Sequence, residues 1–336
     1  MLIGNTDVED ALQRLNDLTE EEARIAYAEL CRTTHSLCEG ALRKWLSPPD
    51  PSTNHNNLWK THLKGTTDWF TCGTVFKDWK SAGSLLWVHG NRGFLLAFSM
   101  RSVLTIFNLI AGSGKSVLWF VLSFFFRLVG LKWFCSSAII EDLMSLRESG
   151  NASVAYFYCD FRDDDKQSCR NLLHSLIVQL SARSESRCDI LTDLYNSHDR
   201  GLREPSNCAI TECLKNMLTV LSHNPTYIIL DALDECPNTS GILSPRKQVL
   251  DLVKELVGLP LPNLYICVSS RPEVDIRDVL QPLALHQVSL HDENGQRQAI
   301  IDYITHVVDS DENMQKWRKE DRDLVIKTLS AKADGM

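Results

Sequence analysis

Residues 227–235 read Tyr227-Ile228-Ile229-Leu230-Asp231-Ala232-Leu233-Asp234-Glu235, an apolar run that ends in carboxylates. Within it, the short run 227–231 predicts a buried β-strand. Carboxylates at the end of such a strand are suited to hold Mg²⁺ beside phosphates and to orient a water molecule. Asp231 is therefore the predicted Mg²⁺ ligand. Asp234 and Glu235, just past the strand, are predicted to position an attacking water.

Other parts of the chain repeat this strand-like composition. The runs are 85–89, 154–160, 264–269 and 286–290. Between them, apolar residues recur at helical spacing: Leu172, Leu173, Leu176, Ile177 and Leu180; Leu214, Met217, Leu218 and Leu221; and Val249, Leu250, Leu252, Val253 and Leu256. Nearly all-apolar strands that alternate with helices indicate a parallel sheet covered on both faces. The sequence thus predicts an α/β fold of three layers, with helices on either side of a mostly parallel sheet.

A glycine-rich segment, Ala111-Gly112-Ser113-Gly114-Lys115-Ser116, has the sequence of the second half of a phosphate-binding loop. In such a loop the glycines let backbone N–H groups surround phosphate oxygens, and the lysine reaches the β and γ phosphates. Gly112, Gly114 and Lys115 are therefore predicted to bind nucleotide, and Ser116 to bind nucleotide and Mg²⁺. The full motif needs a glycine five residues before Gly114, where the chain has Leu109.

The missing first half of the loop stands upstream, where the run 85–89 ends in Gly90-Asn91. Removing residues 92–110 restores a complete G-x-x-x-x-G-K-S motif, so Gly90 is also predicted to bind nucleotide. A second apolar stretch, 119–134, interrupts the helix expected after the loop. Removing the first segment restores the phosphate-loop motif, and removing the second restores the helix that follows it. We therefore interpret both in-frame segments as translated introns.

The alternative for these two apolar segments is contact with a membrane. Arg101 and Arg127 lie near their centres, and neither segment reaches the roughly 20 clean apolar residues of a membrane span. Membrane insertion is therefore the weaker interpretation.

Two further predicted strands end in charged residues. Arg271 follows the run 264–269, and Asp160 closes the run 154–160. The ends of parallel strands share one edge, where a guanidinium is able to touch a γ-phosphate. Arg271 is therefore a candidate catalytic residue. An acidic strand end or a Ser-Arg-Pro turn is common in isolation, but the order of loop, acidic strand end and arginine strand end points to one site.

Other clusters of polar residues have simpler explanations. The run Asp163-Asp164-Asp165 is typical of a solvated turn. His55, His62 and Cys72 lack the spacing of zinc ligands and are interpreted as structural.

Composition excludes several classes of protein. The chain has 336 residues, of which 44% are hydrophobic, enough for a sizeable core in about two domains. Its formal net charge of −8 argues against a general electrostatic grip on nucleic acid. The 11 cysteines are scattered without a C-x-x-C pair, and residues 1–7 have neither a cationic nor an apolar leader region. Reduced thiols in a cytoplasmic protein are expected.

Four segments organise the chain. Residues 1–46 are a predicted helical lead, in which Thr19-x-x-Glu22 forms a capping box, and 47–83 are a linker and approach to the core. The predicted core spans 84–290, with the apparent insertions 92–110 and 119–134. Residues 291–336 are the expected start of a further helical region, truncated at Met336.

Several blocks of the sequence resemble one family in its order. They are Leu42–Asp50, Gly65–Phe70, Tyr156–Asp163, Ile229–Pro237 and Val268–Pro272. The chain resembles the NACHT domain of fungal STAND P-loop nucleoside triphosphatases, and it is similar to the nephrocystin-like N-terminal domain. The resemblance implies that Lys115 and Ser116 bind phosphate and Mg²⁺, that Asp231 is the Walker B acid and that Arg271 is a sensor.

The resemblance also implies a signalling switch. Such NLR-like proteins hold nucleotide in a closed monomer, exchange it when a C-terminal ankyrin or WD repeat array senses a ligand, and oligomerise to activate an effector, often in non-self recognition. We therefore expect a domain that binds ATP or GTP with Mg²⁺ and hydrolyses it slowly, with protein partners that the sequence does not name. The alternative is an inactive interaction scaffold whose phosphate loop is disrupted by residues 92–110.

Overall fold

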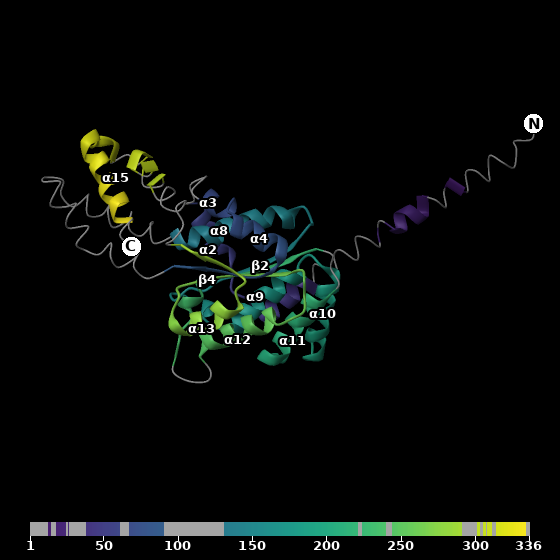
Figure 1. Ribbon diagram of the computed structural model, residues 1–336. Coiled ribbons are helices and arrows are strands. Elements are labelled where there is room, and N and C mark those ends of the chain that lie inside the picture. The colour runs from purple at the N-terminus through teal and green to yellow at the C-terminus, as the bar shows by residue number, and fades with distance from the viewer. Residues whose placement is uncertain are drawn as a thin grey trace, which may run out of the picture.

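Short apolar strands and amphipathic helices alternate along the chain and build a parallel sheet with helices on both faces (Figure 1). The computed structural model describes residues 13–14, 18–24, 26, 38–60, 67–90, 131–220, 224–239, 244–290, 301–302, 305–306, 308–310 and 314–333. The strands of this part are β1 (Ser84–His89), β2 (Ser153–Tyr158), β3 (Thr226–Asp231), β4 (Leu264–Ser270) and β5 (His286–Ser289). They match the predicted runs to within two residues.

The strands pair in the order β2-β3-β4-β1-β5, and every pairing is parallel. Parallel pairing requires a crossover after each strand, which the intervening helices supply. The predicted α/β class is therefore confirmed, with a sheet that is consistent with a P-loop-like fold. This order puts β4 between β1 and β3, so the strand before Gly90 and the strand that ends in Asp231 are two positions apart.

One face of the sheet is covered by five helices. They are α9 (Cys169–Ser181), α10 (Glu185–Ser197), α11 (Asn207–Thr219), α12 (Pro245–Val257) and α13 (Val274–Leu283). Alternate strand residues such as Leu85, Phe157 and Leu230 point into this layer and form one buried cluster with the helices. Figure 1 shows these helices below the sheet. Apolar spacing predicted α9, α11 and α12, but it missed α10 and α13.

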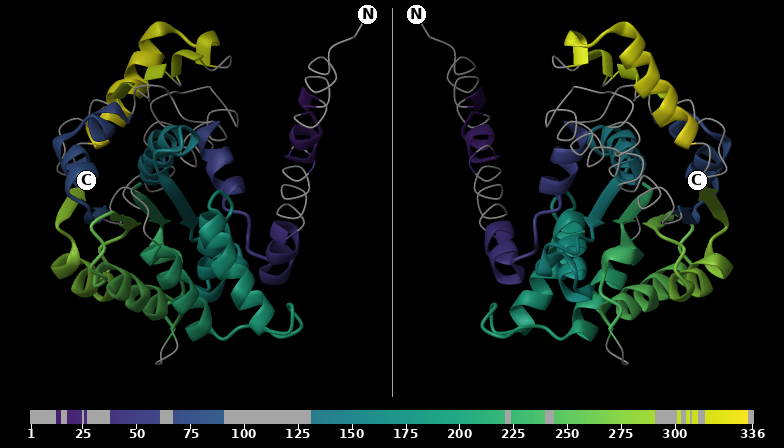
Figure 2. Two further views of the ribbon diagram at one scale, coloured as in Figure 1. Left: turned by 90° about the vertical axis from the view of Figure 1, so that its right-hand side faces the viewer. Right: turned by 90° about the vertical axis from the view of Figure 1, so that its left-hand side faces the viewer.

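The other face is covered by α3 (Asp68–Thr71), α4 (Thr74–Ala82) and α8 (Leu131–Glu148), with α2 (Ser52–Trp59) beside α8. The remaining strand residues, among them Leu86, Tyr156 and Ile229, pack here in a second cluster around Trp79. Helix α8 begins inside the segment 119–134, and its residues Ile139, Ile140 and Leu143 pack against the sheet in this cluster. The two views of Figure 2 show the same layers end-on.

Serines fix the starts of three consecutive helices. The side chains of Ser168, Ser184 and Ser206 accept hydrogen bonds from backbone N–H groups in the first turns of α9, α10 and α11. Each such cap satisfies a donor that has no partner inside the helix. In contrast, residues 18–24 are helical, so Thr19 lies within a helix and the predicted capping box there is wrong.

The end of the helical lead is part of the core. Residues 38–46 are helical, and Leu42 and Leu46 are buried against the α9–α13 layer. Trp45 makes an edge contact with Tyr195 on α10, with 5.2 Å between ring centroids. Near the other terminus, η3 (Met314–Lys316) precedes α15 (Lys319–Ala333). Across the described residues, no helix is both long enough and apolar enough to cross a bilayer.

Candidate functional site

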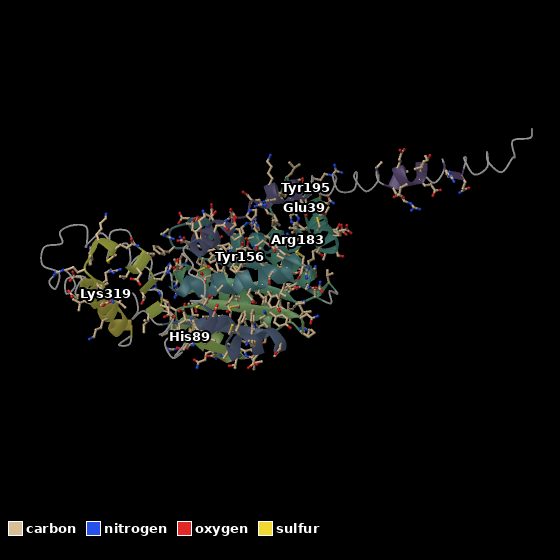
Figure 3. All side chains as sticks on the ribbon, turned by 90° about the horizontal axis from the view of Figure 1, so that it is seen from above. Glu39, His89, Tyr156, Arg183, Tyr195 and Lys319 are labelled. Atoms are coloured by element: carbon tan, nitrogen blue, oxygen red, sulfur yellow. The ribbon has the colours of Figure 1, made fainter. Side chains whose placement is uncertain are left out.

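The carboxyl ends of the strands bring most of the described candidate residues to one edge of the sheet. Gly90 follows β1, Asp231 ends β3 and Arg271 follows β4. Neighbouring strands lie about 4.8 Å apart, so β1 and β3 are separated by about 10 Å across β4. Ligand sites of open α/β sheets lie at this edge. Figure 3 labels His89, the last residue of β1, on this side of the molecule.

Asp231 is a buried carboxylate held by two serine hydroxyls. Its side chain accepts hydrogen bonds from Ser136 on α8 and Ser269 on β4, and the residue is 1% exposed. The negative charge of Asp231 adds to burial in raising the pKa of the nearby Cys135 thiol to about 12. The carboxylate and the two hydroxyls supply only oxygen atoms, which is the chemistry that Mg²⁺ prefers. These residues therefore fit the predicted cation.

Asp231 does not belong to a cluster of metal-ligating side chains in the part of the chain that the structure describes. Among the residues that the structure describes, no three His, Cys, Asp or Glu side chains group closely enough to hold a metal ion by themselves. A cation at Asp231 thus needs oxygens from phosphate or water, as Mg²⁺ beside a nucleotide does. The run Asp163–Asp165 belongs mostly to the short helix η1 (Asp164–Lys166) and is largely solvated, as predicted.

A left-handed turn at Ala232 redirects the chain after β3. Ala232 has φ 55° and ψ 45°, a conformation that costs a residue with a β-carbon about 1 kcal/mol. Its N–H donates to the Ser269 hydroxyl at 2.9 Å, and its carbonyl accepts from the Glu235 N–H at 2.8 Å. These contacts start η2 (Leu233–Glu235), which places Asp234 and Glu235 beside the end of β4.

Asp234 and Arg271 bind each other. The Asp234 carboxylate accepts a hydrogen bond from the Arg271 backbone N–H at 2.8 Å, and its second oxygen lies 3.1 Å from the Arg271 Nε. The Asp234 side chain is 3% exposed, whereas that of Arg271 is 32% exposed. The sequence assigned these residues separate roles, toward a water and toward a γ-phosphate. In this structure the aspartate instead orients the arginine, whose outer part faces solvent.

Arg246 stabilises the turn at residues 232–236 by hydrogen bonds to its backbone. This buried α12 side chain donates from Nε to the Cys236 carbonyl at 3.0 Å and from Nη2 to the Asp234 carbonyl at 2.6 Å. Its Nη1 lies 2.6 Å from Glu273 and 3.3 Å from Asp275. Burial alone would lower the pKa of Arg246, but these carboxylates reverse the effect and raise it. The guanidinium therefore ties η2 to the segment that follows Arg271.

Glu235 is a half-buried carboxyl group whose pKa is raised to about 7. Burial is the largest cause, and the charges of Asp234, Asp231 and Asp160 add to it, while a hydrogen bond from the Phe161 N–H at 3.2 Å acts in the opposite direction. A carboxyl group with a pKa near neutral pH is suited to accept a proton from water. Of the two carboxylates proposed to position water, Glu235 is thus the better placed to act as a base.

An open cleft of about 600 Å³ exposes these groups. Its lining includes Phe161, Gln167, Asp234, Glu235, Arg246 and Arg271. A cleft of this size admits a ligand at the sheet edge. The chemistry available on its wall is an arginine cation and a carboxyl group of raised pKa.

At the same edge of the sheet, the Asp160 carboxylate accepts hydrogen bonds from neighbouring side chains. Burial would raise its pKa, but the hydrogen bonds and charge of Arg162 outweigh burial and lower it. The Arg162 guanidinium donates to both Asp160 oxygens at 2.9 Å, and Asn54 on α2 donates at 3.3 Å. Asp160 therefore binds α2 to the sheet, and His55 on the same helix joins a buried network with Glu141 and Tyr158.

The remaining nucleotide-binding candidates lie outside the described residues. They are Gly112, Gly114, Lys115 and Ser116, which fall within 91–130. Leu109 and the inserted segment 92–110 fall there too.

A comparison with known families covers the part of the chain that builds this edge. The family model described as nephrocystin 3, N-terminal matches residues 131–271. The match extends from the first residue of α8 to Arg271, and it includes Asp231, Asp234 and Glu235. A search of curated proteins finds no match to this chain. The matched interval thus starts after Lys115 and Ser116.

Sequence reasoning missed three residues that shape the site. Ser136 and Ser269 hold Asp231, and Arg246 holds the carbonyls of η2. A signal existed only for Ser269, which is a polar residue at the end of an otherwise apolar strand. Ser136 and Arg246 lie on helices far from the motif, so nothing in local spacing marks them.

Proposed function

We propose that this chain is a NACHT-type switch domain that binds ATP or GTP with Mg²⁺ and hydrolyses it slowly, in an NLR-like signalling or non-self-recognition protein of the fungal STAND class. One observation carries the proposal: the buried Asp231 at the end of β3 shares an edge with the Asp234–Arg271 pair and with Glu235, whose pKa is about 7. The match to the nephrocystin 3 N-terminal family over this region supports it.

In the proposed mechanism the residues have distinct tasks. Asp231 and Ser116 would hold a Mg²⁺ ion, which when bound would neutralise negative charge on the phosphates. Gly90, Gly112, Gly114 and Lys115 bind the phosphates themselves. Glu235 accepts a proton from the attacking water, which requires its ionised form.

Arg271 is the residue that links nucleotide state to conformation. It lies 3.1 Å from Asp234 in this structure, and its side chain is one-third exposed to the cleft. A γ-phosphate at the cleft competes with Asp234 for the guanidinium, because both are oxyanions that bind an arginine fork. Loss of that phosphate on hydrolysis returns Arg271 to Asp234. In the proposed switch, this exchange precedes oligomerisation and the engagement of protein partners in the cytoplasm.

The test is equilibrium binding of fluorescent Mg²⁺–ATP and Mg²⁺–GTP analogues to the whole chain. We expect saturable binding that is lost in Lys115→Ala and weakened at least about tenfold in Asp231→Asn, because a charge-assisted contact to the cation disappears. Asp193→Asn is the matched control, since it removes an exposed acid on α10, a helix that does not line the cleft. Equal binding by all variants would contradict the proposal.

A second function, an interaction scaffold that binds no nucleotide, is favoured by a different observation. Residues 92–110 interrupt the phosphate loop, and the family match begins only at residue 131. A chain that lacks 92–110 and 119–134 separates the possibilities. If only the shortened chain binds nucleotide, the two segments block the loop. If neither chain binds, the scaffold function stands.

A further inference from the structure

The opposite edge of the sheet contains a cavity with a different chemistry. It has a volume of about 300 Å³ and lies where α8 ends, β2 begins and α9 passes into α10. Three arginines line it, namely Arg147, Arg183 and Arg187, and Glu148 is the only acidic residue among the lining side chains that the structure describes. In Figure 3 the labelled Arg183 lies at the end of the domain away from His89.

Arg187 is the most deeply buried cation in this cavity. The residue is 2% exposed, in the first turn of α10. It donates from Nε to the Met217 carbonyl at 3.1 Å, from Nη1 to the Ser153 hydroxyl at 2.7 Å and from Nη2 to the Thr226 hydroxyl at 2.9 Å. All three acceptors are neutral, and they use three of the five guanidinium N–H groups. Burial lowers the pKa of Arg187.

Arg147 and Arg183 add positive charge to the same space. Burial lowers the pKa of Arg147, and the like charge of Arg183 lowers it further, while Tyr156 and Glu148 act in the opposite direction. Within the described part of the chain, none of the three arginines has a carboxylate oxygen within the 4.0 Å of an ion pair. Arg187 is buried, Arg147 is half-buried and Arg183 is exposed. Buried charges in proteins are normally paired, yet Arg187 has no carboxylate partner among the described residues. With Glu148 as one acid against three arginines, the lining of the cavity carries a net positive charge.

We propose that this cavity binds a tetrahedral oxyanion, either inorganic phosphate or the phosphate group of a small phosphate monoester. Planar guanidinium groups offer paired N–H donors that match phosphate oxygens. The N-terminus of the 13-residue helix α10, where Ser184 is the cap, faces the same space and favours negative charge. The cluster is also unexpected by composition, because the chain as a whole carries a formal charge of −8.

The oxyanion site is separate from the nucleotide site. The cavity includes Ser153 and Val154 at the start of β2, whereas Asp231 pairs with Tyr158 at the other end of that strand and Asp160 lies just past it. A strand of six residues spans about 17 Å, so one ligand of this size does not reach both edges. The oxyanion is thus a second ligand, and its binding does not depend on the phosphate loop.

The test is isothermal titration of the whole chain with sodium phosphate and, in a second arm, with glycerol 3-phosphate at low ionic strength. We expect saturable binding with a dissociation constant of about 1 mM or tighter. The variant Arg147→Gln/Arg183→Gln should bind at least about tenfold more weakly, because two charge-assisted contacts are lost. The matched control Arg200→Gln/Arg203→Gln removes the same charge from an exposed turn and should bind like the wild type.

Lys115→Ala distinguishes this site from the nucleotide site. Phosphate binding that persists in Lys115→Ala and is lost in Arg147→Gln/Arg183→Gln supports the proposal, whether or not the chain binds nucleotide. Tighter binding of glycerol 3-phosphate than of phosphate assigns the site to phosphate monoesters, and equal binding assigns it to free phosphate. Binding that is unchanged in Arg147→Gln/Arg183→Gln, or no saturable binding at all, would overturn it. Arg147 and Arg183 are both more exposed than Arg187, so we expect the double variant Arg147→Gln/Arg183→Gln to keep its fold.

Discussion

Two buried arginines at opposite edges of the sheet show how differently this fold treats positive charge. Arg246, at the carboxyl edge, lies 2.6 Å from Glu273 and 3.3 Å from Asp275, and its pKa is raised. Arg187, at the amino edge, is as deeply buried but donates only to neutral oxygens, and its pKa is lowered. Arg246 therefore connects two segments of the chain, and its positive charge is balanced by the two carboxylates. Arg187 retains a charge that a ligand is able to use.

The largest effect is expected when each arginine is replaced by methionine. Arg246→Met leaves Glu273 and Asp275 without their cation and two carbonyls without a donor, so it should lower the free energy of unfolding by about 3 kcal/mol. Arg187→Met removes a charge that has no carboxylate partner, and it should cost only about 1–2 kcal/mol for the lost hydrogen bonds. Urea unfolding measures both.

Arg203→Met, at an exposed position, is the control for these unfolding experiments and should leave the urea midpoint unchanged. If Arg187→Met proves as costly as Arg246→Met, the contrast between a compensated and an uncompensated arginine is wrong.

The next largest effect concerns hydrolysis at the carboxyl edge. Glu235→Gln should reduce the rate of nucleotide hydrolysis about 100-fold, because a group that accepts a proton from water contributes this much or more. Nucleotide binding should change little. In the wild type, the rate should rise with pH through about 7, where Glu235 ionises. Phosphate release assays between pH 5.5 and 8.5 measure this, and a rate that does not depend on pH in this range counts against Glu235 as the base.

Glu235 also makes stability depend on pH. Its pKa rises from an ordinary 4.5 to about 7 on folding, so between these values the folded state binds more protons than the unfolded state. The contribution of this group to stability therefore falls as pH rises from about 4.5 to 7 and stays low above pH 7. With allowance for partial exposure, Glu235→Gln should stabilise the chain by about 1–2 kcal/mol at pH 8.

The same variant at pH 4.5 should unfold close to the wild-type urea concentration, because residue 235 is then uncharged in both folded proteins and only about half of the unfolded wild-type chains are ionised there. A stabilisation of Glu235→Gln that is the same at pH 4.5 and pH 8 would show that the pKa of this carboxyl group is not raised.

The smallest effect concerns the turn that carries Asp234 and Glu235. Ala232→Gly should raise the free energy of unfolding by about 0.5–1 kcal/mol, because glycine adopts a φ of 55° without the cost of a β-carbon. Ala182→Gly, at a right-handed position at the end of α9, should have the opposite sign. Thermal unfolding of the two variants checks the difference, and destabilisation by Ala232→Gly would exclude a left-handed residue there.

The sequence predicted the fold better than it predicted the relations within the site. Strands and their polar ends could be recognised because buried strands are apolar runs with abrupt boundaries, and this located Asp231, Glu235 and Arg271 at one edge. The pairing of Asp234 with Arg271 could not be recognised, since it depends on the left-handed turn at Ala232 and on sheet order. Neither property appears in local spacing.

The cavity at the amino edge of the sheet could not be predicted from sequence patterns, for a related reason. Arg147, Arg183 and Arg187 come from the end of α8 and from the junction of α9 with α10, and no motif joins them. Helix α10 itself was missed, because its apolar residues are few and its polar residues are many. Only the packing of α9 and α10 on β2 shows that the three cations share one cavity.

The most direct test of the central claim, that the carboxyl edge binds nucleotide, is hydrogen–deuterium exchange of the whole chain with and without Mg²⁺–ATP. We expect slower exchange in peptides that cover 231–235 and 269–271 when nucleotide is present, and unchanged exchange in those that cover 147–153 and 183–187. Protection confined to the amino edge, or no protection at saturating nucleotide, would contradict it.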